Sequence, residues 1–224
     1  MIGIVTGVHK TGYDVRVDKD TLFCLVKPND ERPVVGDEVI ITKIEDKFFI
    51  TEVKRRKNLV QRYDVHKNRH QPFAANVDVM LIVTSANKEF NIERIRRFSS
   101  LAPDMKTIVV LTKVDLTGDV ENYTKQLDGE FKYIVINATQ DIDVNLIKKL
   151  FKKGETALLV GSSGVGKTTI INTLCGLNLK TNETMRHDSG KHTTSARTMY
   201  FTKCGRKVID IPGVKQVGVS PIDN

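Results

Sequence analysis

The sequence predicts a small all-β barrel followed by a doubly wound α/β domain that carries a phosphate-binding loop. Short β-rich segments separated by turn residues fill residues 1–55. Strand-like and helix-like segments alternate from residue 76 onward. Within this second part, the run GSSGVGKT at residues 161–168 lies between a short apolar stretch and a helix-like one. A strand, a glycine-rich turn and a helix are expected there.

The N-terminal segments are short, and most of them alternate apolar and polar residues, which is typical of half-buried strands. A barrel of this kind buries one face of each strand and leaves the other in water. The sequence therefore predicts a small antiparallel barrel, such as an OB-fold, over residues 1–55. OB-folds often bind oligonucleotides, but a fold alone does not establish a function. The expected strands are residues 2–8, 12–17, 21–26, 38–42 and 47–53.

Residues 56–75 are expected to form a linker, and its surroundings are strongly basic. Between residues 54 and 70, seven basic residues face a single acid, Asp64. Such a cluster predicts contact with nucleic acid, and a solvated linker rich in basic residues is the alternative. The candidate RNA-binding residues are Lys54, Arg55, Arg56, Lys57, Arg62, Lys67 and Arg69.

Residues 76–224 are expected to form one α/β domain. Buried strands show as continuous apolar runs, whereas the helices between them carry apolar residues on one face. The expected strands are residues 77–84, 107–111, 133–136, 157–160, 197–202 and 206–211, the last two forming a hairpin that turns at Cys204 and Gly205. The expected helices are residues 91–101, 120–127, 144–151 and 169–177.

The run GSSGVGKT fits the pattern G-x-x-x-x-G-K-[ST] of phosphate loops. Its glycines let backbone N–H groups face a phosphate, and the helix N-terminus adds a favourable dipole. Lys167 is expected to reach the β- and γ-phosphates, and Thr168 to hold Mg²⁺. The alternative is a chance turn of glycine and serine before a helix. The candidate phosphate-binding residues are Gly161, Ser162, Ser163, Gly164, Val165, Gly166, Lys167, Thr168 and Thr169.

Two further segments indicate that the base is guanine. Residues Thr112-Lys113-Val114-Asp115 follow an expected strand and fit the pattern [NT]-K-x-D. The Asp115 carboxylate can accept hydrogen bonds from guanine N1–H and the N2 amine, a donor pair that adenine lacks. The aliphatic part of Lys113 can cover the base plane. At the end of the next strand, in Asn137-Ala138-Thr139, the Ala138 N–H can bind guanine O6. For Asp115, an ordinary helix N-cap is the alternative.

The last segments concern the γ-phosphate. Asp210-Ile211-Pro212-Gly213 follows a strand and fits D-x-x-G, so Asp210 is expected to bind Mg²⁺ through water and the Gly213 N–H to sense the γ-phosphate. The polar run Gly190-Lys191-His192-Thr193-Thr194 lies where switch I is expected, and Thr194 is the candidate ligand of Mg²⁺ and γ-phosphate. Plain loop residues are the alternative for both threonines.

The order of these motifs is abnormal. An ordinary GTPase has the phosphate loop first and the guanine-recognition segments last, whereas here Thr112 to Thr139 precede Gly161. This order predicts a circularly permuted GTPase domain. Three strands precede the phosphate loop, one leads into it and two follow, which is enough to rebuild a six-stranded GTPase sheet.

Composition excludes some other classes of protein. Cys24, Cys175 and Cys204 are widely spaced and form neither a disulfide framework nor a C-x-x-C pair, so a reducing cytoplasm is expected. No apolar run approaches the roughly 20 residues of a membrane span, and the N-terminus does not resemble a signal peptide. The net charge of +8 suggests an anionic partner.

A barrel followed by a permuted GTPase domain resembles the RsgA (YjeQ/YloQ) family of small-ribosomal-subunit-dependent GTPases. The resemblance rests on Gly161–Thr169, Gly190–Thr194 and Asp210–Gly213 and covers essentially the whole chain. It implies GTP hydrolysis stimulated by the small (30S) ribosomal subunit, late in the maturation of that subunit, with rRNA as a partner. A monomer is expected. The alternatives are an RNA-binding, nucleotide-dependent switch with negligible hydrolysis, and a P-loop ATPase or kinase.

The sequence departs from the family pattern in several places. Thr112 replaces the usual Asn, and Asn137 replaces the usual Ser. The family ends in a zinc-binding domain, whereas this chain stops at Asn224. Because its three cysteines and five histidines (His9, His66, His70, His187 and His192) form no such cluster, no zinc site is expected.

The catalytic group is not evident from the pattern. Val214 occupies the position after D-x-x-G where Ras-like enzymes carry a glutamine that orients water. A valine cannot orient water, so a weak or inactive hydrolase is one interpretation. The other is a catalytic group from elsewhere, for which His192 is the candidate. Turnover of the isolated protein is expected to be slow, on the order of 10⁻⁴ to 10⁻² s⁻¹.

Overall fold

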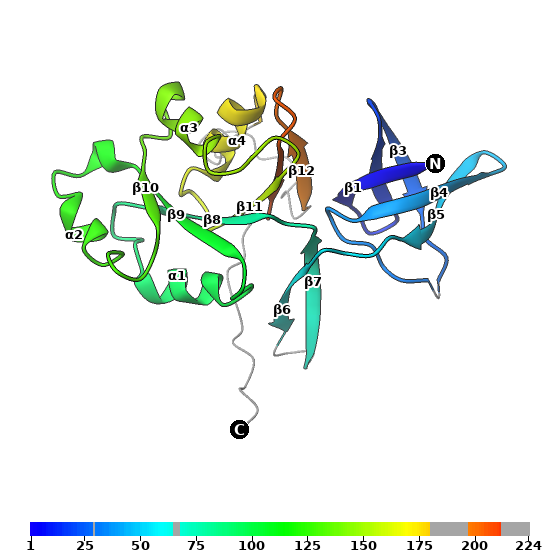
Figure 1. Ribbon diagram of the computed structural model, residues 1–224, viewed down its shortest axis with the longest axis horizontal. Helices are drawn as coiled ribbons and strands as arrows, with labels where there is room; N and C mark the ends of the chain where they lie inside the picture. The colour runs from blue at the N-terminus through cyan, green and yellow to red at the C-terminus, as the bar shows by residue number, and fades with distance from the viewer. Residues whose placement is uncertain (29, 65–67, 180–196, 212–224) are drawn as a thin grey trace, which may run out of the picture.

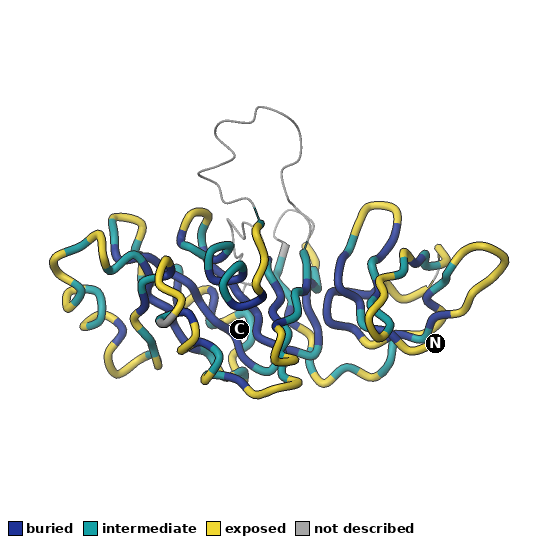
Figure 2. The backbone as a smooth tube through the Cα atoms, turned by 90° about the horizontal axis from the view of Figure 1, so that it is seen from above, coloured by how far each residue is buried: buried dark blue, intermediate teal, exposed yellow. Residues whose placement is uncertain are grey.

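The computed structural model describes residues 1–28, 30–64, 68–179 and 197–211 of the 224-residue chain. A β-barrel lies at one end of the molecule and an α/β domain at the other, with a β-hairpin between them (Figure 1). Buried backbone follows the strands, whereas the loops at the rim are exposed (Figure 2).

The N-terminal barrel contains the expected strands. They pair in the order β1-β2-β3-β5-β4, and β4 pairs back with β1 to close the barrel. Its core is formed by inward-facing apolar side chains such as Val15, Val39 and Ile50. The strands are β1 (Ile2–Val8), β2 (Tyr13–Val17), β3 (Asp20–Leu25), β4 (Glu38–Ile44) and β5 (Lys47–Val53).

One pairing corrects the expectation of a wholly antiparallel barrel, because β3 and β5 run parallel. The reason is the long connection between β3 and β4, which carries the chain across the barrel so that β4 pairs with β1. The β4–β5 hairpin then brings β5 back beside β3 in the same direction. A strand pattern in the sequence cannot specify this choice, because it gives the strands but not their neighbours.

The segment expected as a linker contains a β-hairpin, formed by β6 (Leu59–Asp64) and β7 (Arg69–Ala75). Val60 and Phe73 are buried in the same core as the adjacent α/β sheet, so these apolar residues anchor a segment that is otherwise polar. The high charge of the segment obscures this pattern in the sequence. An isolated bridge from Val35 to Ala74 also joins the hairpin to the barrel's β3–β4 connection.

The α/β domain contains the six expected strands in the order β10-β9-β8-β11-β13-β12. All neighbours are parallel except β12, which pairs antiparallel with β13 in the expected hairpin. The strands are β8 (Val79–Ser85), β9 (Lys106–Thr112), β10 (Tyr133–Val135), β11 (Thr156–Val160), β12 (Thr198–Phe201) and β13 (Lys207–Asp210).

Helices cover both faces of this sheet, because successive side chains of its buried strands point to opposite sides. In β8, Leu81 packs on the face with α3 (Asp141–Ile147) and α4 (Lys167–Cys175), whereas Ile82 packs on the face with α1 (Ile92–Ser99). The helix α2 (Glu121–Thr124) is shorter than the expected 120–127, and α3 begins and ends earlier than the expected 144–151.

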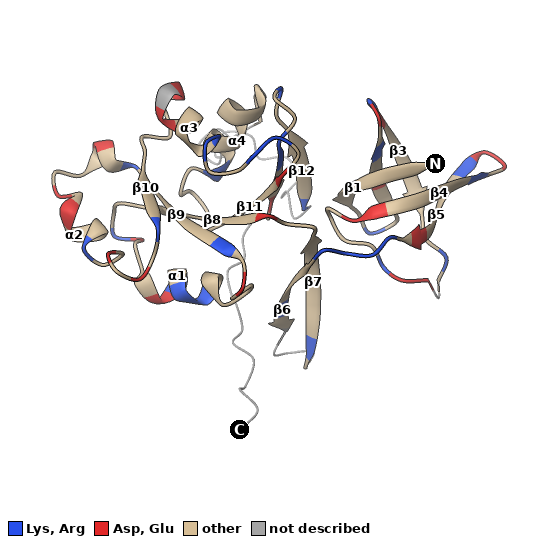
Figure 3. Cartoon of the chain, in the orientation of Figure 1, with Lys and Arg blue, Asp and Glu red and all other residues tan. Residues whose placement is uncertain are grey.

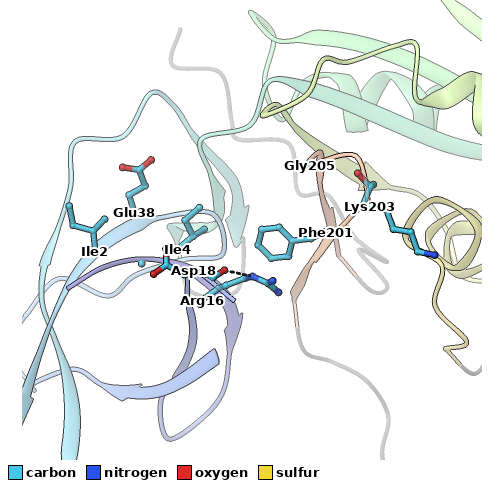
Figure 4. Close-up of a pocket in the computed structure, with 10 residues that line it drawn as sticks. Ile2, Ile4, Arg16, Asp18, Glu38, Phe201, Lys203 and Gly205 are labelled. Carbon is cyan, nitrogen blue, oxygen red and sulfur yellow. Dashed lines mark hydrogen bonds between the residues drawn. The ribbon is translucent and has the colours of Figure 1, made fainter. Parts of the chain in front are cut away.

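The barrel and the α/β sheet are joined directly, because β1 pairs with β12 at Gly7 and Thr198. The guanidinium of Arg16 lies 4.5 Å from the ring centroid of Phe201 across this junction, and its Nε donates to the carbonyl of Asp18 (Figure 4). The groove between the barrel and the β12–β13 hairpin has a volume of about 520 Å³. The barrel is therefore connected to the edge strand of the domain that carries the phosphate loop.

Candidate nucleotide-binding site

The phosphate loop joins the central strand β11 to the start of α4. Gly161 and Gly166 both have positive φ, at 150° and 102°. A Cβ at Gly161 would lie 2.2 Å from the carbonyl oxygen of Val83, so only glycine fits beside β8. Gly166 is the N-cap of α4, and its αL conformation turns the chain into the helix. The loop thus has the shape that the sequence predicts.

Lys167 reaches back over this loop from the first position of α4. Its Nζ donates to the carbonyls of Gly161 (2.8 Å) and Ser162 (2.7 Å). The residue is only 8% exposed, and this burial lowers the pKa of its ammonium, while the nearby Asp210 carboxylate acts in the opposite direction. The positive charge is therefore held at one place, at the base of the loop.

Asp210 ends β13, the strand beside β11. Burial raises the pKa of its carboxyl group, against the lowering effect of Lys167 and of a backbone hydrogen bond from Ile211. Its Oδ1 is buried and has no hydrogen-bond partner among the described residues. Buried polar atoms are nearly always satisfied, so an unpartnered carboxylate oxygen here fits a bound cation or the water of its shell.

The segment expected to recognise guanine begins at the end of β9. Thr112 is fully buried, and its Oγ1 lies 2.6 Å from the carbonyl oxygen of Val165 and 3.1 Å from that of Thr84. This hydroxyl therefore ties the phosphate loop to the ends of two strands. Lys113 follows in the αL conformation, with φ at 59°.

Asp115 lies within the short 3₁₀ helix Val114–Leu116 and is exposed. The N-cap of this helix is Lys113, and no side chain caps it. The arrangement does not support the alternative that Asp115 is a helix N-cap.

The second guanine segment follows β10. The Asn137 side-chain oxygen accepts hydrogen bonds from the backbone N–H and the hydroxyl of Thr139. The backbone N–H of Asn137 donates to the Asp143 carboxylate at 2.8 Å. These bonds hold the turn in which Ala138 is buried.

The three segments meet at one edge of the sheet. A Cβ placed on Gly166 would lie 3.5 Å from the Ala138 Cβ and 3.8 Å from the Thr112 Oγ1. Residues widely separated in sequence are thus brought around the helix N-terminus, at the carboxyl ends of parallel strands. Ligands of open α/β sheets bind at this edge.

Several candidate residues lie outside the described residues: His192, Thr193, Thr194, Gly213, Val214 and Lys67. Their roles stay predictions. The expectation that the chain has no zinc site also stays a prediction, because His66, His187 and His192 too lie outside the described residues. In the part of the chain that is described, no group of three or more His, Cys, Asp or Glu could hold a metal ion.

The basic segment, residues 54–70, begins with a continuous run of positive charge at Lys54–Lys57, between the barrel and the hairpin (Figure 3), whereas Arg62 and Arg69 lie in the hairpin strands. Much of this charge is paired within the chain. Arg56 donates to both oxygens of the fully buried Asp37 carboxylate, at 2.7 and 2.8 Å, and these bonds raise the pKa of its guanidinium. The neighbouring pairs are Lys54 with Glu38, Lys57 with Asp78 and Arg62 with the side-chain oxygen of Gln71. Arg55 and Arg69 are exposed, and neither has an ion pair among the described residues.

One residue near the loop is missed by sequence motifs. Arg94, in the first turn of α1, donates from Nη1 to the Ser162 hydroxyl at 2.8 Å. Its only sequence signal is its position on the helix that follows β8, the strand beside β11. No described helix is both long enough and apolar enough to cross a membrane.

Comparisons with known proteins agree with this arrangement. The model of the RsgA GTPase family matches residues 53–220. A small ribosomal subunit biogenesis GTPase, RsgA 2, from Vibrio parahaemolyticus is 32% identical over 93% of this chain and 60% of its own length. RsgA 1 from Listeria monocytogenes is 34% identical over 97% of this chain and 66% of its own length.

A solved structure is also similar. The crystal structure of YjeQ from Thermotoga maritima superimposes with a TM-score of 0.73 and 25% identity, over 99% of this chain and 78% of that one. The chain thus spans about 60–66% of the length of the two curated relatives described above. The matched residues include the phosphate loop and the strands around it, and on these findings the chain belongs to the RsgA GTPase family.

Proposed function

We propose that this protein binds GTP at the edge formed by the phosphate loop and hydrolyses it to GDP and phosphate during maturation of the small ribosomal subunit. The observation that carries the proposal is the meeting of Gly166, Ala138 and Thr112 at the helix N-terminus. A phosphate site and a guanine site need to be adjacent for one nucleotide to occupy both. The names of the two similar proteins support the ribosomal role.

The strand order supports a circular permutation of the GTPase domain. The strands β9 and β10 lead to the two guanine segments and precede β11 in sequence. In the sheet they lie beyond β8, on one side of β11. The strand that carries Asp210 lies on the other side. A nucleotide laid across the end of β11 then has its base near Asp115 and its γ-phosphate near Asp210. For the barrel, the five strands and their closure through the β4–β1 pairing support an OB-fold.

Each residue of the site has a proposed task. The backbone N–H groups of the loop and the Lys167 ammonium hold the phosphates, and Asp115 selects guanine. Thr168 and Asp210 are the candidate ligands of Mg²⁺ among the described residues, and the unpartnered Asp210 oxygen fits this assignment. When bound, Mg²⁺ neutralises charge on the phosphates. His192 remains the candidate for orienting water, and Thr194 for closing switch I.

The test is GTP turnover with and without small ribosomal subunits. We expect slow turnover alone and a large stimulation by the subunits, because Val214 cannot orient water and a group must be supplied or positioned. A His192→Ala variant should lose the stimulated rate. If it does not, His192 has no part in the mechanism. Competition between GDP and ADP for a fluorescent guanine nucleotide tests the base, and equal competition would exclude a GTPase.

A second candidate is an RNA-binding switch with negligible hydrolysis. The observation that favours it is Val214, which removes the usual water-orienting glutamine. Binding of rRNA that depends on the nucleotide, together with turnover that the ribosomal subunit does not change, would favour this function. Both functions require rRNA contact in the cytoplasm, for which Arg55, Arg62 and Arg69 are the candidates that have no ion pair among the described residues.

A further inference from the structure

Arg94 lies beside the phosphate loop but belongs to none of its motifs. Asn91 caps α1, its Oδ1 accepting from the Arg94 amide at 2.8 Å, so the backbone of Arg94 is fixed in the first turn of the helix. From there the guanidinium donates to the Ser162 hydroxyl at 2.8 Å and to the Glu89 carbonyl at 3.4 Å. The side chain is half-buried between α1 and the loop.

The other arginines of α1 behave differently. Arg96 pairs with the carboxylates of Glu93 and Glu130, and the exposed Arg97 donates to the Glu93 carbonyl. Arg94 has no ion pair with any residue that the structure describes. Its charge is directed at the loop instead of being neutralised on the surface of the helix.

Ser162 connects this charge to the phosphate-binding lysine. The Ser162 hydroxyl accepts a hydrogen bond from Arg94, and the Ser162 carbonyl accepts one from the Lys167 Nζ at 2.7 Å. The residue whose carbonyl anchors the lysine is thus also held, through its side chain, by the arginine. A shift of Ser162 would move one of the two carbonyls that position the Lys167 ammonium.

We propose that Arg94 is a positioning residue for phosphate binding, which acts through Ser162 to place the Lys167 ammonium. The proposal rests on the proposed function and deepens it, because it assigns the preorganisation of the phosphate half of the site to a residue from a neighbouring helix. Preorganised donors strengthen binding because they do not need to be ordered when the ligand arrives.

The experiment uses the complete chain and four variants: Arg94→Gln, Ser162→Ala, the double variant and Arg97→Gln. The last removes the same charge from the same helix without touching the loop. Dissociation constants are measured for GDP and for guanosine, together with kcat and KM for GTP. We expect Arg94→Gln and Ser162→Ala each to weaken GDP about three- to tenfold and to leave guanosine unchanged, because guanosine has no phosphate. Arg97→Gln should match the wild type.

The double variant tests the route through Ser162. If Arg94 acts through that hydroxyl, both changes remove the same hydrogen bond. The double variant should then bind GDP no more weakly than whichever single variant has the lower GDP affinity. Additive losses would overturn the proposal, as would equal losses for guanosine, which would indicate a general disturbance of the fold. GDP affinity of Arg94→Gln equal to that of Arg97→Gln would overturn it as well.

These outcomes separate the inference from the proposed function. A wild type that binds GDP but does not hydrolyse GTP, with or without ribosomal subunits, would overturn the proposed GTPase activity. The GDP measurements would still decide the role of Arg94. A wild type that binds neither GDP nor GTP would overturn both.

Discussion

At the scale of single residues, Thr112 shows how a departure from a family pattern can be accommodated. The family usually has asparagine there, with a longer side chain. The threonine hydroxyl nevertheless contacts the loop at Val165 and the end of β8 at Thr84, at 2.6 and 3.1 Å. A hydroxyl has a single proton, so it can donate fully to only one of these carbonyls. The short distance to Val165 indicates that the loop receives it.

We predict that Thr112→Val loosens the phosphate loop. Valine has nearly the same shape but leaves the buried Val165 carbonyl without this partner, which should cost about 1–2 kcal/mol of unfolding free energy. Since a looser loop is less preorganised, GDP should bind about fivefold more weakly. Urea unfolding and GDP titration measure the two effects. Thr107→Val, on the same strand, is the control, because among the described residues the Thr107 hydroxyl bonds only to the nearby Met105 carbonyl. Unchanged affinity in Thr112→Val would contradict the prediction.

Asp210 and Lys167 form the second residue-scale feature: Lys167 is buried, Asp210 is half-buried with a buried Oδ1, and both side chains lose solvation. The pKa of Asp210 is raised mainly by burial, so its native state binds a proton more readily than the unfolded chain does. By linkage, this carboxyl group stabilises the fold most when it is protonated. Ionising this carboxyl group therefore costs stability, and perturbed carboxyl groups of this kind are common at functional sites.

We predict that the wild type, free of nucleotide and metal, gains stability relative to Asp210→Asn as the pH falls from neutral. The gain should begin as the pH passes through the raised pKa of Asp210 and should be complete below the ordinary value of 3.8. Urea unfolding of both proteins in a chelator, across that range, measures it. Because asparagine does not titrate, the difference between the two proteins isolates Asp210. A difference independent of pH would show that burial does not shift this carboxyl group.

At the scale of elements, the basic segment has a structural role that its charge conceals. Arg56 is bound to Asp37, whose side chain is fully buried and also accepts from the Val34 amide at 2.8 Å. This pair holds the β3–β4 connection against the start of the segment that leads to β6. Arg55, one residue earlier, is exposed and has no ion pair among the described residues. Adjacent arginines therefore have different roles.

We predict that Arg56→Gln destabilises the protein by about 3 kcal/mol, because it leaves the buried Asp37 carboxylate without the positive charge that compensates it. Arg55→Gln should leave the unfolding free energy within about 0.5 kcal/mol of the wild type. If Arg55 contacts an rRNA phosphate, its loss should reduce the salt dependence of RNA binding by about one unit in the log–log slope. Urea unfolding and RNA binding at several salt concentrations separate the two roles. Equal destabilisation by both variants would contradict them.

At the scale of the whole molecule, the barrel is paired directly with the α/β sheet. The β1–β12 pairing makes the barrel and the α/β sheet continuous, and Arg16 packs on Phe201 of β12 (Figure 4). The strand β12 is also paired with β13, which ends in Asp210. The barrel is therefore connected through β12 to the strand that ends in the candidate metal ligand.

We predict that Arg16→Gln weakens this junction by about 0.5–1 kcal/mol, the usual range for a cation–π contact at a partly exposed site. The unfolding transitions of the barrel and of the α/β domain should then separate, whereas we expect them to coincide in the wild type. Calorimetry detects the separation. The control is Lys43→Gln, which removes a contact with Phe48 that lies wholly within the barrel. Coincident transitions in both variants would show that Arg16 does not couple the two parts.

The sequence alone determined most of the strands, though not β6 and β7, and the position of the glycine-rich loop between β11 and α4. Strand periodicity depends on neighbouring residues, and the backbone of GSSGVGKT is restricted by its glycines, so both are local properties that a pattern can reveal. The same holds for most helices, with boundaries displaced at α2 and α3 and, by two residues, at α4, because helix ends depend on packing and capping.

Only the tertiary structure decided which residues meet. The parallel β3–β5 pair, the hairpin within the basic segment, the pairing of Arg56 with Asp37 and the reach of Arg94 to Ser162 all join residues that are distant in sequence. Charge in a sequence looks the same whether it faces solvent or a buried carboxylate. The folded chain distinguishes the two, because a buried carboxylate must be compensated by a nearby partner.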